Sequence, residues 1–261
     1  MNIFFIGDIF GKPGRQVVIS FLPKLIREFD IDICVANGEN VAQGRGITKK
    51  TAEPLFEAGI DVFTSGNHLW DKKESLEFIK YEERICKPLN YPDKAPGNKH
   101  YVCRTSDGKK LCVLTLCAQA FMPPVNSPFQ TFDEYLPILR KETNNILIDF
   151  HGEATAEKRA MGFFVDGKVS ALIGTHTHIQ TADEEILPNG TAYITDVGMT
   201  GPHDSVIGVD KRIILEKMTS GVPKRYEVSK QGLQINAVVI KLDEKTGKAF
   251  EITRIKRKIH E

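Results

Sequence analysis

Short apolar runs alternate with amphipathic stretches through the first quarter of the chain. Three runs have the length and composition of buried strands: residues 2–6, 31–36 and 61–64. Between them, apolar side chains recur at helical spacing over residues 13–29 and 48–58, and Gly59 closes the second stretch. Pro23 conflicts with the first helical pattern and predicts a kink, and Pro54 weakens the second. The alternation predicts parallel β-α-β units with right-handed crossovers.

The remainder of the chain is richer in strands than in clear helical patterns. Residues 81–108 are rich in proline, lysine and asparagine and predict a long loop or insertion. Apolar runs predict buried strands at 111–118, 145–150, 168–173 and 191–195, and a loop is expected at 198–202. Residues 233–242 and 249–256 predict an antiparallel hairpin. Neither an internal repeat nor a linker is evident, so we expect one α/β domain over residues 1–261.

Composition narrows the class of protein. With 261 residues, of which 41% are hydrophobic and 26% charged, the chain can bury a full core. These values exclude a disordered, collagenous or coiled-coil chain. A formal net charge of +1 gives no global field for a nucleic-acid polymer or an anionic membrane. We interpret the basic residues 254–258 as the solvated face of a terminal strand.

The sequence also predicts a compartment. No apolar run approaches the length of a membrane helix, and the first residues lack the basic start of a signal peptide. The five cysteines form no C-x-x-C pair, and Cys34, Cys112 and Cys117 lie in apolar runs. Such cysteines are typical of small core residues in a reducing environment, so we expect a cytoplasmic protein.

Side chains that can bind metal ions follow five of the predicted strands. They are Asp8, Glu39, Asn40, Asn67, His68, His151, His176 and His178. In open sheets of this kind, working groups collect at the carboxyl ends of the strands. Asp8 and Glu39 would repel each other if they were buried together without a cation. One or two divalent cations would satisfy the set, and mixed oxygen and imidazole ligands suit manganese, iron or zinc better than calcium or magnesium.

Each of these residues has a simpler interpretation when it is taken alone. Asp8 is typical of a turn or a helix cap, and Glu39 would serve equally to cap the next helix. His151 alone is typical of a hydrogen-bonded core or surface histidine. His176 and His178 would share a face if the strand continued through them, whereas a polar loop would give the same letters. The conjunction at five strand ends is what favours a metal site.

The strand-end motifs also resemble those of a known family. They are Gly7-Asp8, Asn37-Gly38-Glu39-Asn40, Gly66-Asn67-His68-Leu69-Trp70-Asp71, His151, Gly174-Thr175-His176-Thr177-His178 and Gly198-Met199-Thr200-Gly201-Pro202. Together they resemble the signature of the calcineurin-like metallophosphoesterases, and more narrowly of the YmdB-type branch. Phe10 stands where the wider superfamily has a second histidine, and Glu39 where it has a bridging aspartate. Both departures fit the narrower branch.

The resemblance implies a fold and a set of ligands. The fold is α/β, with two mixed β-sheets packed as a sandwich and flanked by helices. The ligands hold two divalent metal ions of the iron or manganese type, with zinc as the alternative. The first ion is expected on Asp8, Asn40 and His178. The second is expected on Asn67, His151 and His176, and Glu39 is expected to bridge the two ions.

Further roles depend on that pair of ions. Two neighbouring ions can share a hydroxide that attacks phosphorus. His68 follows Asn67 directly and is not needed as a ligand, so we assign it as the general acid to the leaving alkoxide. Asp71 would orient His68 or would simply begin a helix, and Arg45 would contact a phosphate or lie free on a surface loop. Residues 200–202 with His203 would wall the pocket or form a tight turn.

The resemblance implies hydrolysis of small phosphodiesters, with 2′,3′-cyclic nucleotides as the best-supported substrates. Balanced net charge agrees with a small nucleotide partner, so we expect neither membrane association nor strong binding of polymeric nucleic acid. The first alternative is a regulatory protein that binds nucleotide or RNA and uses the metal site as a receptor. The second is hydrolysis of a non-phosphate bond at the same metals. Self-association into a homo-oligomer is expected from the resemblance alone.

Overall fold

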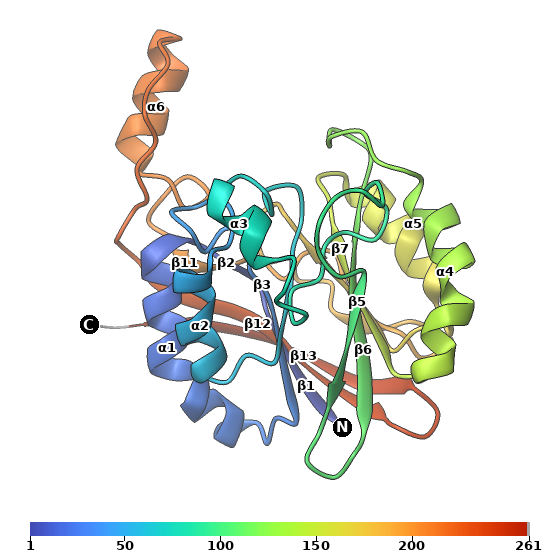
Figure 1. Cartoon of the computed structure of the whole chain (residues 1–261). Coiled ribbons are helices and arrows are strands. Elements are labelled where there is room, and N and C mark those ends of the chain that lie inside the picture. Colours follow the sequence, from blue (N-terminus) through green and yellow to red (C-terminus); the bar gives the residue numbers. More distant parts are fainter. Residues whose placement is uncertain (260–261) are drawn as a thin grey trace.

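The computed structural model describes residues 1–259 and places two β-sheets face to face (Figure 1). The first sheet contains β1 (Asn2–Ile6), β2 (Asp8–Ile9), β3 (Ile33–Asn37), β4 (Val62–Thr64), β11 (Met199–Pro202), β12 (Leu233–Asp243) and β13 (Lys248–Lys258). The second contains β5 (His100–Arg104), β6 (Lys110–Cys117), β7 (Ile146–His151), β8 (Ala171–Thr175), β9 (Glu185–Ile186) and β10 (Ala192–Ile194). Each sheet holds parallel and antiparallel pairs, which confirms the two mixed sheets predicted.

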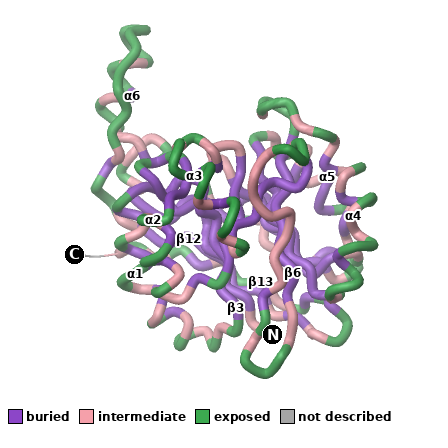
Figure 2. Tube along the Cα trace, in the orientation of Figure 1, coloured by how far each residue is buried: buried purple, intermediate pink, exposed green. Residues whose placement is uncertain are grey.

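Helices cover the outer faces of both sheets. Their bounds are α1 (Gly11–Glu28), α2 (Lys49–Glu57), α3 (Lys73–Phe78), α4 (Pro128–Glu142), α5 (Thr155–Val165) and α6 (Lys211–Ser220). In Figure 1, α1 and α2 lie against the first sheet and α4 and α5 against the second. By contrast, α6 projects away from the body and is exposed over most of its length (Figure 2).

Strand alternation builds the layered core. Along β1, the side chains of Ile3 and Phe5 enter the cluster between the two sheets, while Phe4 and Ile6 enter the cluster under α1 and α2. This is the period of two expected for a strand that is buried on both faces. A third cluster lies between the second sheet and the helices α4 and α5. The buried segments in Figure 2 accordingly follow the strands. The core shared by both sheets favours the single domain, which stays a prediction.

Several element predictions hold and others are wrong. The hairpin of β12 and β13 is confirmed, and α2 follows a capping box at Thr48. The helix α1 continues through Pro23. The predicted loop at 81–108 contains β5, which pairs antiparallel with β6 along its whole length. The predicted loop or tight turn at 200–202 belongs to β11, which pairs with β2 and β12 and is fully buried.

The cysteine prediction is confirmed as far as packing goes, because all five thiols are buried and free. Within residues 1–259, no helix combines the length and the apolar character needed to cross a bilayer.

Candidate metal centre

The two sheets deliver the predicted ligand residues to one place. Asp8 lies in β2, Glu39 and Asn40 follow β3, and Asn67 and His68 follow β4, all in the first sheet. The second sheet contributes His151, the last residue of β7, together with His176 and His178 just beyond β8. A cavity of about 310 Å³ opens there, lined by Glu39, Asn40, His68, His176 and His178 among others.

Three atoms surround one nitrogen of the buried His151. Its Nε2 lies 3.1 Å from Oδ1 of Asn67, 3.2 Å from Oε1 of Glu39 and 3.1 Å from Nδ1 of His176. The ligand atoms of Glu39, His151 and His176 all lie within 4.8 Å of one another. The structure therefore brings together the residues expected to hold the second ion, with Glu39 beside them.

Hydrogen bonds on the outer side of His151 set which nitrogen carries hydrogen. The hydroxyl of Thr175 donates to Oδ1 of Asp149 at 2.6 Å, so its oxygen accepts from Nδ1 of His151 at 2.9 Å. A neutral His151 then turns the bare Nε2 toward Glu39 and Asn67. Lone pairs that converge on one point favour a cation there, and such outer partners are typical of metal-binding histidines.

His176 and His178 are arranged like His151, with the outer ring nitrogen against a protein oxygen and the inner one toward the cluster. Nε2 of His176 lies 3.2 Å from Oε2 of Glu153 on the outer side of the ring, and its Nδ1 faces His151. Nδ1 of His178 donates to the carbonyl of Ile207 at 3.0 Å, which leaves its Nε2 toward Oδ1 of Asp8, 4.0 Å away. His151 and His178 are thus hydrogen-bonded at the outer nitrogen, His176 lies against a carboxylate there, and all three turn the inner nitrogen toward the cluster.

Two buried oxygens beside His178 have no hydrogen-bond partner. These are Oδ1 of Asp8 and Oδ1 of Asn40. The amide nitrogen of Asn40 donates to the carbonyl of Gly44 at 3.0 Å, which turns its oxygen away from that contact. An unpaired buried carboxylate oxygen is costly unless a cation or a proton satisfies it. Asp8, Asn40 and His178 therefore fit the expected first ion.

Electrostatics at the cluster agree with a site for positive charge. Burial raises the pKa of Asp8 well above its ordinary value, and the charges of Asp196 and Glu39 add to the rise although His151 opposes it. Burial alone would raise the pKa of Glu39 and lower that of His151, but their mutual attraction and hydrogen bond reverse both effects. The pKa of Glu39 is about 2 and that of His151 about 9. The negative charges of Glu39, Asp8 and Asp149 stabilise a proton on His151. The same charges would stabilise a bound cation.

Of the two alternatives for His176 and His178, a continued strand or a polar loop, the structure has the loop. β8 ends at Thr175, and the two histidines have φ angles of +97° and +65°. Left-handed backbone is uncommon for residues other than glycine and costs about 1–3 kcal/mol per residue where the surroundings enforce it. The two left-handed residues turn both imidazoles into the cavity by a loop.

A buried ion pair lies behind this loop. Nζ of Lys158 donates to the carbonyl of Thr175 and to Oδ2 of Asp196, both at 2.7 Å. The same oxygen of Asp196 accepts from the backbone nitrogen and the hydroxyl of Thr177, the residue between the two histidines. No sequence pattern singles out Lys158, because one lysine in a helix is usually solvated.

His68 lies at the mouth of the cavity and is oriented by two acids. Its backbone nitrogen donates to Oε2 of Glu39 at 2.9 Å, and its Nδ1 lies 2.8 Å from Oδ2 of Asp71. Asp71 does not begin the following helix, since α3 starts at Lys73. Arg45 lines the same cavity with its side chain 61% exposed, and its guanidinium lies 3.9 Å from Asp71.

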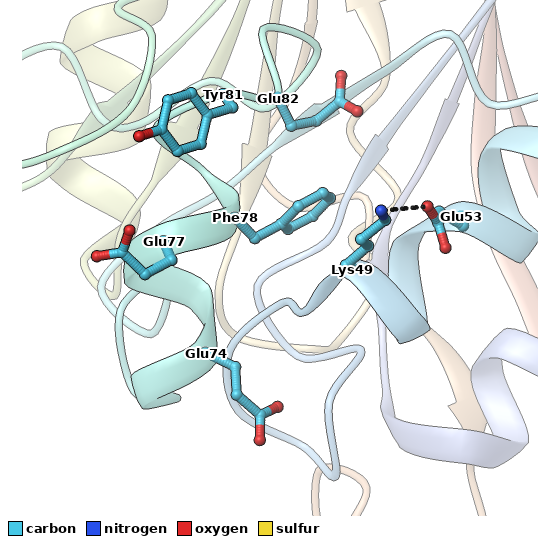
Figure 3. A pocket seen from close by; sticks show the side chains of 7 residues that line it. All are labelled: Lys49, Glu53, Glu74, Glu77, Phe78, Tyr81 and Glu82. Atoms are coloured by element: carbon cyan, nitrogen blue, oxygen red, sulfur yellow. Dashed lines mark ion pairs between the residues drawn. The ribbon is translucent and has the colours of Figure 1, made fainter.

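A larger cavity lies elsewhere, between α2 and α3. Its volume is about 560 Å³, and its lining comprises Lys49, Glu53, Glu74, Glu77, Phe78, Tyr81 and Glu82. Figure 3 shows Lys49 turned toward Glu53, with which it forms an ion pair of 3.5 Å. The remaining acids would repel a phosphate ester, so this cavity does not suit an anionic substrate.

Two acids beside the centre do not stand out in the sequence. Asp149 orients His151 through Thr175, and Glu153 lies beside His176, yet no spacing marks either acid. The signal for Asp149 was a charged residue inside an apolar strand, two positions before His151, where burial demands a partner. Nothing in the sequence points to Tyr226, which lines the cavity from far along the chain.

Comparisons with known proteins find relatives that match almost the whole chain. The sequence profile of the YmdB-like protein family matches residues 4–255. A 2′,3′-cyclic-nucleotide 2′-phosphodiesterase of Bacillus subtilis (strain 168) is 45% identical over 255 residues, which cover 98% of this chain and 96% of the relative. A crystal structure of a protein from Thermus thermophilus superposes with a TM-score of 0.92 at 35% identity and covers 99% of both chains. A phosphatase from Mycoplasma pneumoniae superposes with a TM-score of 0.92 at 33% identity, covering 99% of this chain and 93% of the other.

Proposed function

Because this chain belongs to the YmdB-like protein family, within the calcineurin-like metallophosphoesterases, we propose that it is a metal-dependent phosphodiesterase. The proposed substrates are small phosphodiesters of the 2′,3′-cyclic nucleotide class, as the name of the Bacillus subtilis relative indicates for that protein. Opening of such a ring by water at the 2′ bond leaves a nucleoside 3′-phosphate and a free 2′-hydroxyl.

The proposal assigns the metal ligands as the family resemblance implied. One divalent cation would be held by Asp8, Asn40 and His178, and a second by Asn67, His151 and His176. Glu39 would lie between the two ions. Oxygen and imidazole donors of this kind suit iron or manganese, with zinc as the alternative. When bound, such cations neutralise charge on the phosphate and lower the pKa of water.

His68 is proposed to protonate the leaving oxygen. In the imidazolium form it donates one proton to the 2′-oxygen as the phosphorus–oxygen bond breaks, and it becomes neutral imidazole. Asp71, 2.8 Å from its Nδ1, would hold the ring in one orientation before the transfer. Arg45, at the rim of the cavity, would attract the phosphate.

The cavity dimensions support a small substrate. A volume of about 310 Å³ lies at the lower end of the range for small-molecule sites, about 300–1,000 Å³. The formal net charge of +1 offers a nucleic-acid polymer no overall attraction. The cytoplasmic location and the homo-oligomer stay predictions.

The observation that carries the proposal is the direction of the three imidazoles. The outer N–H groups of His151 and His178 donate to protein oxygens, and the outer nitrogen of His176 lies 3.2 Å from Oε2 of Glu153. The inner nitrogens turn toward carboxylate, amide or imidazole groups. Hydrogen bonding among these groups alone leaves Oδ1 of Asp8 and of Asn40 without partners. A pair of cations would satisfy them all.

The test is turnover of 2′,3′-cyclic AMP by protein reconstituted with manganese or iron, with the product identified by chromatography. We expect adenosine 3′-phosphate, and we expect chelation to abolish its formation. Stoichiometric nucleotide binding without turnover would favour the regulatory receptor instead. Competitive inhibition of this turnover by inorganic phosphate or vanadate would argue against the alternative of a non-phosphate bond.

A further inference from the structure

We propose that Ile207, Val209 and Tyr226 form a binding wall for the nucleobase of the substrate. This inference rests on the proposed function, since it concerns the part of a nucleotide that lies beyond the phosphate. These three residues, here called the apolar wall, come from the segments on either side of α6 and line the metal cavity.

The cavity lining combines two chemically different sets of side chains. Glu39, His68 and His176, together with the exposed Arg45, are polar or charged. The apolar wall is the other set, with Ile207 52% and Tyr226 43% exposed. A cyclic nucleotide has the same two kinds of surface, because its phosphate is anionic and its base is a flat, largely apolar ring. Aromatic and aliphatic side chains beside a phosphate site are suited to a base.

Ile207 adopts a backbone conformation that its own side chain disfavours. Val206 and Val209 exchange two backbone hydrogen bonds of 2.9 and 3.0 Å, so that Ile207 and Gly208 form a two-residue turn. Their φ angles are +46° and +100°, the signs of a type I′ turn. Such turns prefer Asn-Gly, whereas a β-branched residue at positive φ is an outlier. A half-exposed isoleucine gains little from burial to offset this backbone conformation, which favours a role toward a ligand.

The wall is joined directly to the metal centre. The carbonyl of Ile207 accepts the hydrogen bond from Nδ1 of His178 at 3.0 Å. The ring of Phe10 packs edge-on against the same imidazole, with ring centroids 5.4 Å apart, and a Cβ atom at Gly208 would lie 2.5 Å from Phe10. The turn therefore cannot shift without moving His178 or Phe10. A base on the wall would lie next to the phosphate site.

Backbone pairing also holds Tyr226 beside the turn. The backbone nitrogen of Asp210 donates to the carbonyl of Glu227 at 2.9 Å, and Val209 forms a bridge with Val228. Nζ of Lys217 lies 4.8 Å from the centroid of the Tyr226 ring and contacts its hydroxyl. An aromatic ring in this position can stack on any base, so the wall would favour nucleotides over base-free esters without selecting one base.

The test compares two substrates that differ only in the base. They are 2′,3′-cyclic AMP and the 2′,3′-cyclic phosphate of 1-O-methylribose, each assayed for kcat/KM on manganese-loaded protein. We expect the wild type to prefer the nucleotide by about tenfold or more. Tyr226→Ala is expected to lower that ratio about tenfold, and Ile207→Asn about fivefold. Calorimetric binding of adenosine 3′-phosphate should weaken in parallel.

A matched variant separates the wall from general effects. Val222→Asn makes the same kind of change at a side chain that is 54% exposed and does not line the cavity, and it should keep the wild-type ratio. Ile207→Asn restores the preferred turn residues, so its urea midpoint should equal or exceed that of the wild type. Failure of the wild type to hydrolyse either ester would contradict the proposed function. Equal hydrolysis of both esters, or a wild-type ratio in both wall variants, would overturn the wall while leaving that function intact.

Discussion

The ammonium group of Lys158 lies 2.7 Å from Oδ2 of Asp196, and both side chains are buried. The pair lies directly behind the loop that carries His176 and His178. Because Lys158 also binds the carbonyl of Thr175, it joins the end of β8 to that loop. A buried charge pair is weak evidence for stability by itself. Here the pair binds Thr175 and Thr177, the residues on either side of His176 in the loop that carries the two imidazoles.

Replacement of Lys158 by methionine should destabilise the fold. The substitution leaves Asp196 buried without its counter-charge, which typically costs about 3–5 kcal/mol. Urea denaturation measures the change in unfolding free energy. The control is Lys49→Met, which breaks an exposed pair with Glu53 and should cost less than about 1 kcal/mol. Equal urea midpoints for the two variants would contradict the role given to Lys158.

Removal of a carboxylate from the centre should lower its metal content. We expect Asp8→Ala and Glu39→Gln to retain less manganese or iron than the wild type after dialysis, because each variant loses an anionic ligand. Elemental analysis of the dialysed protein is the measurement. Glu53→Gln, at a side chain that is half exposed, should retain the wild-type content. Two full equivalents of metal in both site variants would rule out this ligand set.

Loss of His68 should impair turnover without loss of metal. His68→Ala is expected to lower kcat for 2′,3′-cyclic AMP by about 10²–10⁴-fold, the usual contribution of a general acid. The loss should be smaller for bis-p-nitrophenyl phosphate, whose leaving group needs no proton. His100→Ala, in β5 and outside the cavity lining, should turn over at the wild-type rate. An equal loss with both leaving groups would contradict proton donation by His68.

The half-buried His100 should contribute to acid sensitivity. Burial lowers the pKa of His100 below its ordinary value, while the charge of Glu142 partly opposes the shift. The unfolded chain therefore binds a proton more readily, and the contribution of His100 to stability, present above about pH 6.5, is lost as the pH falls. Denaturation of the wild type and His100→Gln between about pH 8 and pH 5 measures the effect. The variant should lose less stability; identical slopes would exclude His100 as a source.

The sequence predicted the parts of the fold that depend on local pattern. The strand of Asn2–Ile6 is visible as a continuous apolar run, and the hairpin near the carboxyl terminus is visible as two strand-like segments with a turn that contains Gly247. The strand at His100–Arg104 was missed because it is short and lies in a stretch rich in proline, lysine and asparagine, and its pairing with β6 is not visible in the sequence. Helix α6 was missed because only Ile214 among its residues is buried, so its sequence lacks a clear apolar face.

At the candidate centre, the ligand residues could be predicted from the sequence but the residues that orient them could not. Residues at strand ends were predictable because parallel strands deliver their carboxyl ends to one edge. The residues that orient them, such as Lys158 and Glu153, act through distances that no spacing encodes. The turn at Ile207 could not be predicted either. An isoleucine is unusual at positive φ, but this becomes informative only when the structure shows that the position has a positive φ.

The origin of the ligands in two different sheets has a mechanical consequence. Asp8 and Glu39 come from the first sheet, and His151 and His176 come from the second. An ion bound by residues of both sheets would therefore cross-link the two sheets. Sliding or tilting of one layer would pull donors off the ion, and metal loading would therefore make the two layers melt as one unit. Protease resistance and the sharpness of thermal melting should rise together with occupancy.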